Sequence, residues 1–252
     1  MAFSAAADQG FEAGGHGVLK AGSAWMPDNQ INGVDFVLPF RFSKGTWSLG
    51  TRGPVTLRIG EVENLVTARN ITADLQGDYP WTEDNPLLLT NVKVETLGGK
   101  ITMQQLRMPQ HDPALLRVDN ISSSELIGAV NPKQFAMSGP VSGALPFWLD
   151  NEKWIIKDGW LTNPGPMTLR IDKDTADAIV KDNMVAGAAI NWLRYMEISR
   201  SWTRINLDNL GELTMQATIK GTSRVDGKSS SVNLNYTHDE NVFTLWRSLR
   251  FG

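Results

Sequence analysis

Two stretches of the chain carry nearly the same seven residues, Gly53-Pro-Val-Thr-Leu-Arg-Ile59 and Gly165-Pro-Met-Thr-Leu-Arg-Ile171. In each stretch, apolar side chains alternate with threonine and arginine, which is the period-two pattern of a β-strand with one apolar and one wet face. The Gly-Pro pair before each strand is a turn signal. The sequence therefore uses the same turn-and-strand unit twice.

The similarity extends on both sides of these stretches and keeps its order. Leu-Pro-Phe occurs at residues 38–40 and again at 145–147, and a tryptophan, Trp47 or Trp154, lies nine residues after each leucine. Further matches pair Leu97-Gly98 with Leu210-Gly211 and residues 101–104 with residues 213–216. Matches that stay in order indicate an internal repeat of roughly 110 residues, and tandem repeats of one supersecondary unit stack into an extended array.

We therefore expect a mainly β fold, in which tandem repeats of curved antiparallel sheet stack with short helices between repeats. The predicted boundaries are 1–33 for a strand region that continues from a preceding repeat, 34–140 for the first repeat and 141–252 for the second. Pro39 and Pro146 lie at equivalent points inside strands. Because proline lacks a backbone N–H, both predict a sheet edge or a bulge.

Two segments carry helical rather than strand patterns. Residues 174–197 begin with Asp174 as an N-cap candidate and place apolar residues, ending at Met196, along one helical face. Residues 240–249 predict a C-terminal helix, and residues 123–130 predict a shorter helical turn. The helices are few, so the fold class stays mainly β.

The composition of the chain excludes several classes of function. The chain has 252 residues, 41% of them hydrophobic and 20% charged, with a net charge of −3. This is typical of a folded protein and lacks the basic excess of a nucleic-acid-binding domain. With no cysteine, the chain holds no disulfide and no thiol nucleophile. No run reaches the ~20 apolar residues of a membrane span, and the start carries no signal peptide, so we expect an excised piece of a longer chain.

The sequence offers little that points to catalysis. His16, His111 and His238 lie far apart and lack a second ligand at helical metal-site spacing. The serine of Gly139-Pro-Val-Ser-Gly143 lacks the Gly-x-Ser-x-Gly context of a nucleophile elbow. We predict no enzyme, no catalytic residue, no metal and no cofactor; a small-molecule hydrolase with a cryptic site is the weakest alternative.

The strands carry continuous apolar faces, and the family resemblance given in the next paragraph implies that these faces form a trough for acyl chains. Each exposed methylene costs ~0.8 kcal/mol in water, so two chains of about sixteen carbons cost ~25 kcal/mol, most of which a continuous apolar surface removes. An ordinary closed core is the alternative for every one of these side chains. The predicted lipid-binding groove consists of Phe36, Leu38, Phe40, Val55, Leu57, Ile59, Ile101, Met103, Leu145, Phe147, Leu149, Met167, Leu169, Ile171, Leu213, Met215, Ile219, Val232 and Leu234.

Three stretches carry a resemblance to a known family: residues 139–149, residues 154–161 with the strand at 165–169, and residues 232–249. They resemble the C-terminal domain of the YdbH family, AsmA-like intermembrane phospholipid transport proteins of Gram-negative bacteria. The resemblance implies that the repeats form an open, U-shaped (β-taco) groove, which crosses the periplasm and carries phospholipid from the inner toward the outer membrane. It also implies an inner-membrane anchor helix, which would lie in the parent protein and is absent here.

The resemblance further implies a partner, a small outer-membrane lipoprotein of the YnbE type. An open sheet has a free edge that invites strand addition, and the last strand, near Ser231–His238, is the predicted docking site. The predicted partner-binding residues are Val232, Leu234, Tyr236, Val242 and Trp246. A structural or adhesive β-repeat protein with a closed core and no lipid ligand is the main alternative function.

Overall fold

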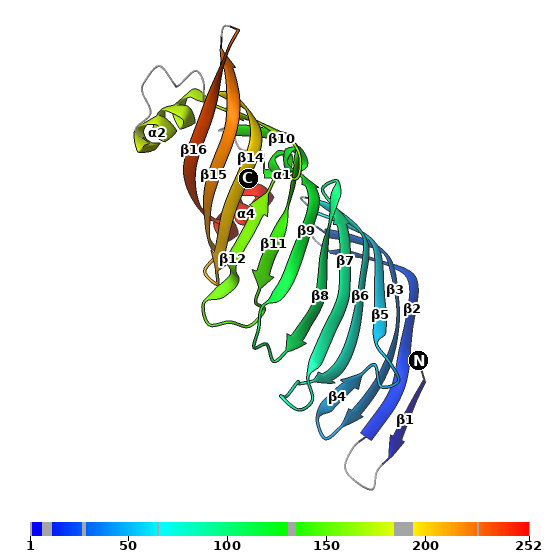
Figure 1. Cartoon of the computed structure of the whole chain (residues 1–252). Helices are drawn as coiled ribbons and strands as arrows, with labels where there is room; N and C mark the ends of the chain where they lie inside the picture. Colours follow the sequence, from blue (N-terminus) through cyan, green and yellow to red (C-terminus); the bar gives the residue numbers. More distant parts are fainter. Residues whose placement is uncertain are drawn as a thin grey trace. The chain divides into compact units, whose positions relative to one another are not determined.

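The computed structural model describes residues 2–6, 12–26, 29–64, 66–130, 135–183, 194–225 and 227–251. The chain divides into two compact units (Figure 1). Unit 1 comprises Met1–Thr96 and Lys100–Leu116, and unit 2 comprises Leu97–Gly99 and Arg117–Gly252.

Unit 1 is a run of antiparallel strands in which two short strands share the same long neighbours. The long strand β3 pairs with β5 at one end and with β4 at the other, and β6 pairs with both of these short strands. Strand β2 flanks β3, while β7 flanks β6 and is followed by β8. The strands are β1 (Ala2–Ala6), β2 (Glu12–Met26), β3 (Asn29–Ser43), β4 (Thr46–Leu49), β5 (Val55–Glu63), β6 (Thr67–Tyr79), β7 (Leu87–Thr96) and β8 (Gly99–Met108).

Unit 2 repeats this arrangement around the long strand β14. One half of β14 pairs with β12 and the other half with β13, so two short strands again share one long neighbour. Strand β11 pairs with β12, β10 pairs with β13, and β15 and β16 follow β14 on its other side. The elements are β9 (Ala114–Ser122), α1 (Ser123–Val130), β10 (Phe135–Ser138), β11 (Pro140–Phe147), β12 (Trp154–Thr162), β13 (Met167–Ile171), α2 (Lys173–Asn183), β14 (Tyr195–Asp208), β15 (Glu212–Val225), β16 (Lys228–Asn241) and α4 (Val242–Phe251).

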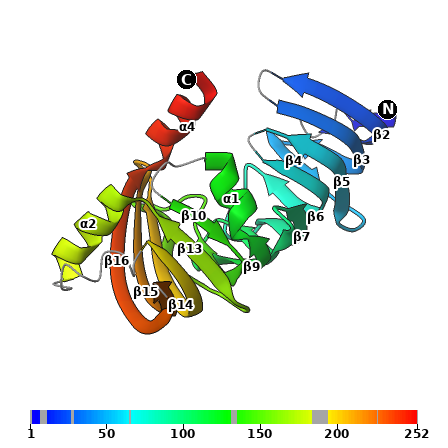
Figure 2. The same ribbon diagram turned by 90° about the horizontal axis from the view of Figure 1, so that it is seen from above.

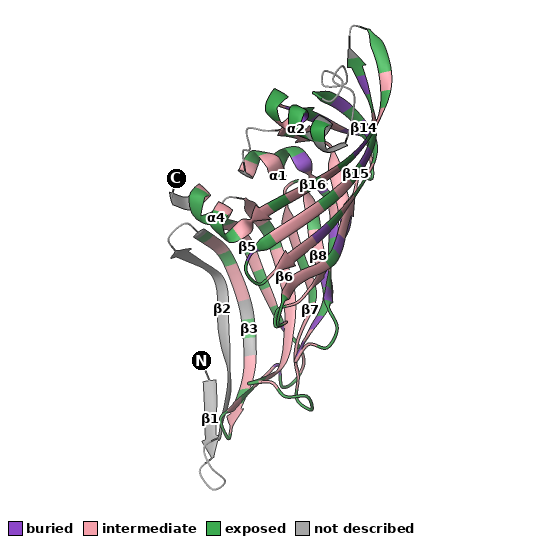
Figure 3. Cartoon of the chain, turned by 90° about the vertical axis from the view of Figure 1, so that its left-hand side faces the viewer, coloured by how far each residue is buried: buried purple, intermediate pink, exposed green. Residues whose placement is uncertain are grey.

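The predicted fold class is confirmed: the chain is mainly β, the sheet is antiparallel and open, and the helices are few and short. Within the described residues, β16 pairs with β15 alone and so leaves a free edge. Few strand residues are fully buried (Figure 3). This burial pattern is expected where one face of a sheet is not covered by a second layer.

The two prolines behave as their missing N–H requires. The register between β11 and β12 shifts between Ala144 and Phe147, so the predicted bulge at Pro146 is confirmed. Pro39 lies in β3 between the segment that pairs with β5 and the segment that pairs with β4. Its carbonyl oxygen accepts a hydrogen bond from the Gly50 nitrogen at 2.8 Å.

The predicted helix over residues 174–197 is wrong at both ends. Helix α2 begins at Lys173 because Asp172, not Asp174, caps it: the Asp172 carboxylate accepts from the Thr175 nitrogen at 2.8 Å. At the other end, Tyr195 already belongs to β14, where Met196 pairs with Leu169 of β13. The rest of the predicted helical stripe, Val185, Ala189 and Trp192, lies outside the described residues.

The other two helices need smaller corrections. Helix α1 spans Ser123–Val130, so the predicted turn over residues 123–130 is confirmed. The C-terminal helix α4 begins at Val242 rather than at residue 240, because β16 continues to Asn241. The Asn241 side chain then caps α4 by accepting a hydrogen bond from the Thr244 nitrogen at 2.9 Å.

The largest buried cluster described in unit 2 joins β13, β14, β15, β16 and α2. Its fully buried members are Met167, Leu169, Ile171, Ala176, Met196, Ile198, Ile219 and Leu234. Helix α2 lies beside β16 and contributes Ala176 (Figure 2). Along β14, the buried Met196 and Ile198 alternate with the exposed Tyr195, Glu197 and Ser199, as a strand requires.

This alternation predicts opposite outcomes for adjacent alanine substitutions. Met196 is 0% exposed, so Met196→Ala should lower the free energy of unfolding by about 2–5 kcal/mol. Glu197→Ala, on the exposed face, should change it by less than about 0.5 kcal/mol. Urea denaturation of the two variants checks this, and equal losses would contradict the strand assignment.

Candidate functional site

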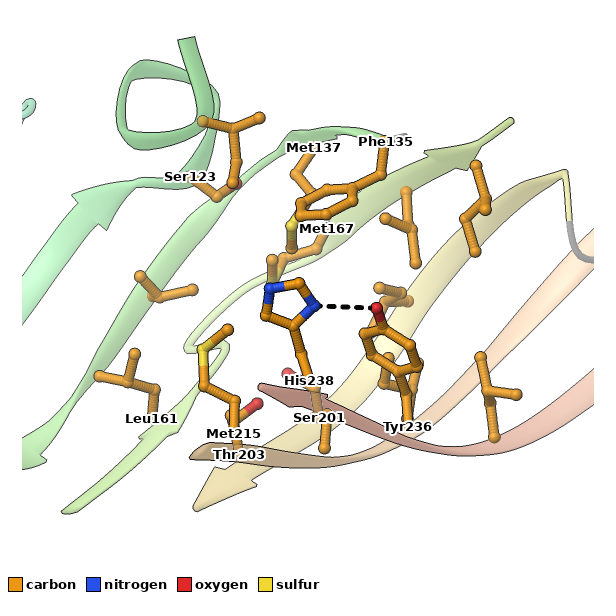
Figure 4. Close-up of a pocket in the computed structure, with 18 of the residues that line it drawn as sticks. Ser123, Phe135, Met137, Leu161, Met167, Ser201, Thr203, Met215, Tyr236 and His238 are labelled. Atoms are coloured by element: carbon orange, nitrogen blue, oxygen red, sulfur yellow. Dashed lines mark hydrogen bonds between the residues drawn. The ribbon is translucent and has the colours of Figure 1, made fainter. Parts of the chain in front are cut away.

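Unit 2 contains a cavity of about 220 Å³ whose lining is almost entirely carbon and sulfur. One wall comes from β10 and β13, and the facing wall comes from β14, β15 and β16 (Figure 4). Helices α1 and α2 and strands β11 and β12 complete the lining. Figure 4 shows the rings of Tyr236 and His238 extending toward Phe135 and Met137.

Strand register places the residues of the β14–β16 wall in rows. One row runs from Thr203 through Ala217 to Tyr236, and the next from Ile205 through Met215 to His238. A third row joins Ser201, Ile219 and Leu234. Side chains directly opposite each other on neighbouring strands point to the same face, so alternate residues of three strands form one surface.

The opposite wall is packed more tightly. Met167, Leu169 and Ile171 of β13 are all buried, and they alternate with Thr168 and Arg170. Beside β13, the short strand β10 adds Phe135 and Met137 to the lining. Because β13 pairs with one half of β14, this wall is hydrogen-bonded to the strand that begins the facing wall.

Three hydroxyl groups of the lining are hydrogen-bonded to protein partners. Thr162 donates to the Ser201 carbonyl oxygen at 2.7 Å, and Ser123 donates to the Gly139 carbonyl oxygen at 2.7 Å. The Ser201 hydroxyl donates to the Asn163 side-chain oxygen at 2.8 Å. A buried polar group without a partner is costly, so these bonds let hydroxyl-bearing residues line an apolar cavity.

Tyr236 and His238 form the most polar part of the lining. The Tyr236 hydroxyl lies 3.1 Å from Nδ1 of His238, and Nε2 of His238 lies 3.2 Å from a carboxylate oxygen of Glu240. Burial raises the pKa of Tyr236, so the phenol stays neutral at physiological pH. The Tyr236 hydroxyl and the His238 ring thus link the cavity wall to Glu240 through hydrogen bonds.

The structure brings together part of the groove that the sequence predicted. Of those residues, six line the cavity, namely Met167, Leu169, Ile171, Met215, Ile219 and Leu234. Val232 packs against the buried cluster beside them. Of the predicted partner-binding residues, Tyr236 also lines the cavity, while Val242 and Trp246 belong to α4.

The remaining predicted groove residues do not line this cavity. Within unit 2, Leu145 and Phe147 are half-buried in β11, Leu213 is half-buried in β15, and Leu149 lies beyond the end of β11 and is 59% exposed. Unit 1 holds the others on β3, β5 and β8: Phe40, Val55, Leu57, Ile59, Ile101 and Met103. The side chains of Phe36 and Leu38 lie outside the described residues.

Several lining residues were missed by the sequence interpretation. Phe135 and Met137 lie on a strand of four residues, which is too short to show a periodic pattern. Leu126 and Ile127 come from α1, whose contribution the strand-based groove did not consider. Ala217 could have been found, because it alternates with Met215 and Ile219 on the same strand.

The other sites considered in the sequence have structural partners. His111 lies in an exposed turn, with Nε2 2.5 Å from a carboxylate oxygen of Glu83. The Ser142 hydroxyl accepts a hydrogen bond from the Asn120 nitrogen at 2.9 Å. His16 has no described side chain. No group of three or more potential metal ligands occurs among the described residues.

Comparisons with known proteins point to lipid transport. A family model described as "YdbH-like: Intermembrane phospholipid transport protein YdbH" matches residues 1–252. The chain is 80% identical over 252 residues to the Escherichia coli (strain K12) protein "Probable phospholipid transport protein YdbH". This match covers 100% of the chain and 29% of that protein, so the chain spans less than a third of its relative. No solved structure matches.

Leu169 and Met215 both line the cavity, but a charged side chain should cost more stability at position 169 than at position 215. Leu169 is only 7% exposed within the buried cluster, so Leu169→Asp would bury an unpaired carboxylate. We expect a loss of about 3 kcal/mol or more in the free energy of unfolding. Met215 is half-buried, so the long side chain of Met215→Arg can place its charge in solvent, and we expect a loss below about 2 kcal/mol. Chemical denaturation of both variants checks this order, and the reverse order would contradict the described packing.

Proposed function

Because the chain belongs to the YdbH-like family of intermembrane phospholipid transport proteins, we propose that it shelters phospholipid acyl chains on the apolar faces of its strands. This membership confirms the resemblance seen in the sequence. On this proposal the chain is the C-terminal segment of a periplasmic bridge between the inner and outer membranes. Its relative of 80% identity is itself named a probable phospholipid transport protein.

The observation that carries the proposal is the cavity in unit 2. Its lining is apolar, the Ser123 and Thr162 hydroxyl groups in it are bonded to protein atoms, and it holds empty volume. A closed β-core would fill such a space with side chains, because protein interiors pack as densely as organic crystals. Acyl chains fit this surface chemically, since each sheltered methylene is worth ~0.8 kcal/mol.

The predicted groove residues have a common role on this proposal. Met215 lies in one row of the wall and Ile219 and Leu234 share another, so an acyl chain would meet similar apolar contacts along the wall. In unit 1, Val55, Leu57 and Ile59 would offer the same kind of surface along β5. A uniform surface holds lipid without trapping it at one position, and transport of this kind needs no catalytic group, metal or cofactor.

The location follows from the family. A protein that moves phospholipid between two membranes works in the periplasm, and we propose that the parent protein is held at the inner membrane by an N-terminal helix. No helix among the described segments is long and apolar enough to cross a bilayer. At the other end, we propose that a small outer-membrane lipoprotein of the YnbE type adds a strand to the free edge of β16.

The lipid proposal predicts that Met215→Arg removes lipid from the purified chain. Native mass spectrometry and lipid extraction should find phospholipid with the unmodified chain and at least about fivefold less with the variant. The reason is that burying the arginine charge against acyl chains costs free energy. Gln216→Arg is the matched control, because Gln216 is exposed on the opposite face of the same strand. The Gln216→Arg variant should carry as much phospholipid as the unmodified chain.

Two results would contradict the lipid proposal. One is a chain that carries no phospholipid when purified from membranes or incubated with vesicles. The other is equal lipid loss in Met215→Arg and Gln216→Arg. Either would favour the alternative of a structural or adhesive β-repeat protein that carries nothing.

The partner proposal predicts where backbone amides become protected. Strand addition satisfies the outward N–H groups of an edge strand, so a soluble form of the lipoprotein should slow hydrogen exchange in β16. The interior strand β14, paired on both sides, serves as the control and should not change. Protection confined to α4, where Val242 and Trp246 lie, would contradict strand addition.

A further inference from the structure

The inner face of β16 changes character along its length. Val232 and Leu234 are apolar, Tyr236 and His238 are polar, and Glu240 is charged. Leu234 is 2% exposed, whereas the side chain of Glu240 is 36% exposed. A surface that grades from apolar to charged matches an amphiphile lying along it with its head toward Glu240.

A chain of hydrogen bonds holds the Glu240 carboxylate in place. A carboxylate oxygen only accepts, so Nε2 of His238, 3.2 Å from Oε2 of Glu240, must carry a hydrogen. The Tyr236 hydroxyl, 3.1 Å from Nδ1, shares a hydrogen bond with the other ring nitrogen. Among the described residues, no hydrogen bond or ion pair reaches the second carboxylate oxygen of Glu240.

At the Glu240 end of the inner face of β16, the nearby charges favour a cationic headgroup over an anionic one. The cavity lining contains no lysine and no arginine, so an anionic headgroup would find no countercharge in it. The carboxylate of Glu240 stands next to the lining through its bond to His238. An ammonium group would pair with that carboxylate in a partly desolvated position, where charge-assisted hydrogen bonds are strongest.

We propose that Glu240, His238 and Tyr236 form a headgroup subsite for a phospholipid that carries an amine. The Glu240 carboxylate binds the ammonium group, while His238 and Tyr236 are positioning residues that fix the carboxylate. The acyl chains lie toward Leu234 and Ile219. This inference rests on the proposed function, because it requires that the cavity holds acyl chains.

The test compares two short-chain lipids of equal tail length. The 252-residue chain is titrated with dihexanoyl phosphatidylethanolamine and dihexanoyl phosphatidylglycerol below their micelle concentrations, and binding is followed by calorimetry or NMR. We expect the ethanolamine lipid to bind about fivefold more tightly or better. Glycerophosphoethanolamine, which has the headgroup but no tails, should bind at least about hundredfold more weakly.

Substitutions separate the subsite from the rest of the cavity. Glu240→Gln keeps the shape and removes the charge, so it should abolish the preference for the amine while leaving phosphatidylglycerol binding within about twofold. Asp239→Asn is the matched control, because Asp239 is the adjacent carboxylate on the exposed face of β16. It should change neither affinity by more than about twofold.

A double-variant comparison tests the positioning role. His238→Gln should reduce the preference for the amine lipid. The double variant with His238→Gln and Glu240→Gln should show the same preference as Glu240→Gln alone, because His238 acts through Glu240. Additive losses would overturn the positioning role, and Tyr236→Phe repeats the test with a smaller change of shape.

Some outcomes overturn the subsite and leave the proposed function standing. These are equal binding of the two lipids to the unmodified chain, or equal effects of Glu240→Gln and Asp239→Asn. Tight binding of glycerophosphoethanolamine would assign the site to a free amine compound rather than to a lipid. If neither lipid binds, both the proposed function and the subsite fail.

Discussion

The cavity depends on the register of β14, β15 and β16. A strand places alternate side chains on opposite faces, so a shift of one residue would turn Met215, Ile219 and Leu234 outward. The register between β15 and β16 continues without interruption from Glu212↔Asn241 to Val225↔Lys228. This uninterrupted pairing keeps Met215, Ala217, Ile219, Val232 and Leu234 on one face of the hairpin, and the interpretation of the cavity follows from it.

A second constraint, shared by both units, is one long strand that pairs with two short ones. Strand β14 pairs with β12 and β13, and β6 pairs with β4 and β5. The short strands carry the sequence matches that first indicated a repeat. A chain that leaves one short strand and enters the next beside the same neighbour needs a turn between them, which explains the Gly-Pro pair before β5 and β13. The shared topology gives the sequence repeat a physical reason, while its boundaries at residues 34, 140 and 141 stay a prediction.

The sequence predicted the strands well because period-two alternation is strong in β5, β15 and β16. The assignment of helix or strand from the sequence was wrong where one residue fits both patterns. Met196 continues a helical stripe from Trp192, but it also alternates with Ile198, and only its pairing with Leu169 decides for a strand. The position of Asn241 decides where α4 begins, and a cap is hard to recognise when polar residues precede it in the same strand.

The candidate site was predictable only in part, because a cavity is a property of tertiary contacts. Six groove residues meet in one cavity because they alternate on β13, β15 and β16, which β14 joins into one run of paired strands. The walls supplied by β10 and α1 come from short segments that no periodic pattern marks. The link from Tyr236 through His238 to Glu240 was also missed: the search used ligand spacings of helices, whereas residues two apart share a face on a strand.

The central claim is that lipid lies against the inner face of β15 and not against its outer face. The most direct measurement places a photo-activated crosslinking side chain at Ala217 or at Thr218, exposes the chain to phospholipid vesicles and analyses the crosslinked lipid by mass spectrometry. Ala217 lines the cavity, and Thr218 is the adjacent, exposed residue. The account predicts phospholipid adducts at position 217 in clear excess over position 218. Equal yields at the two positions, or none at position 217, would contradict it.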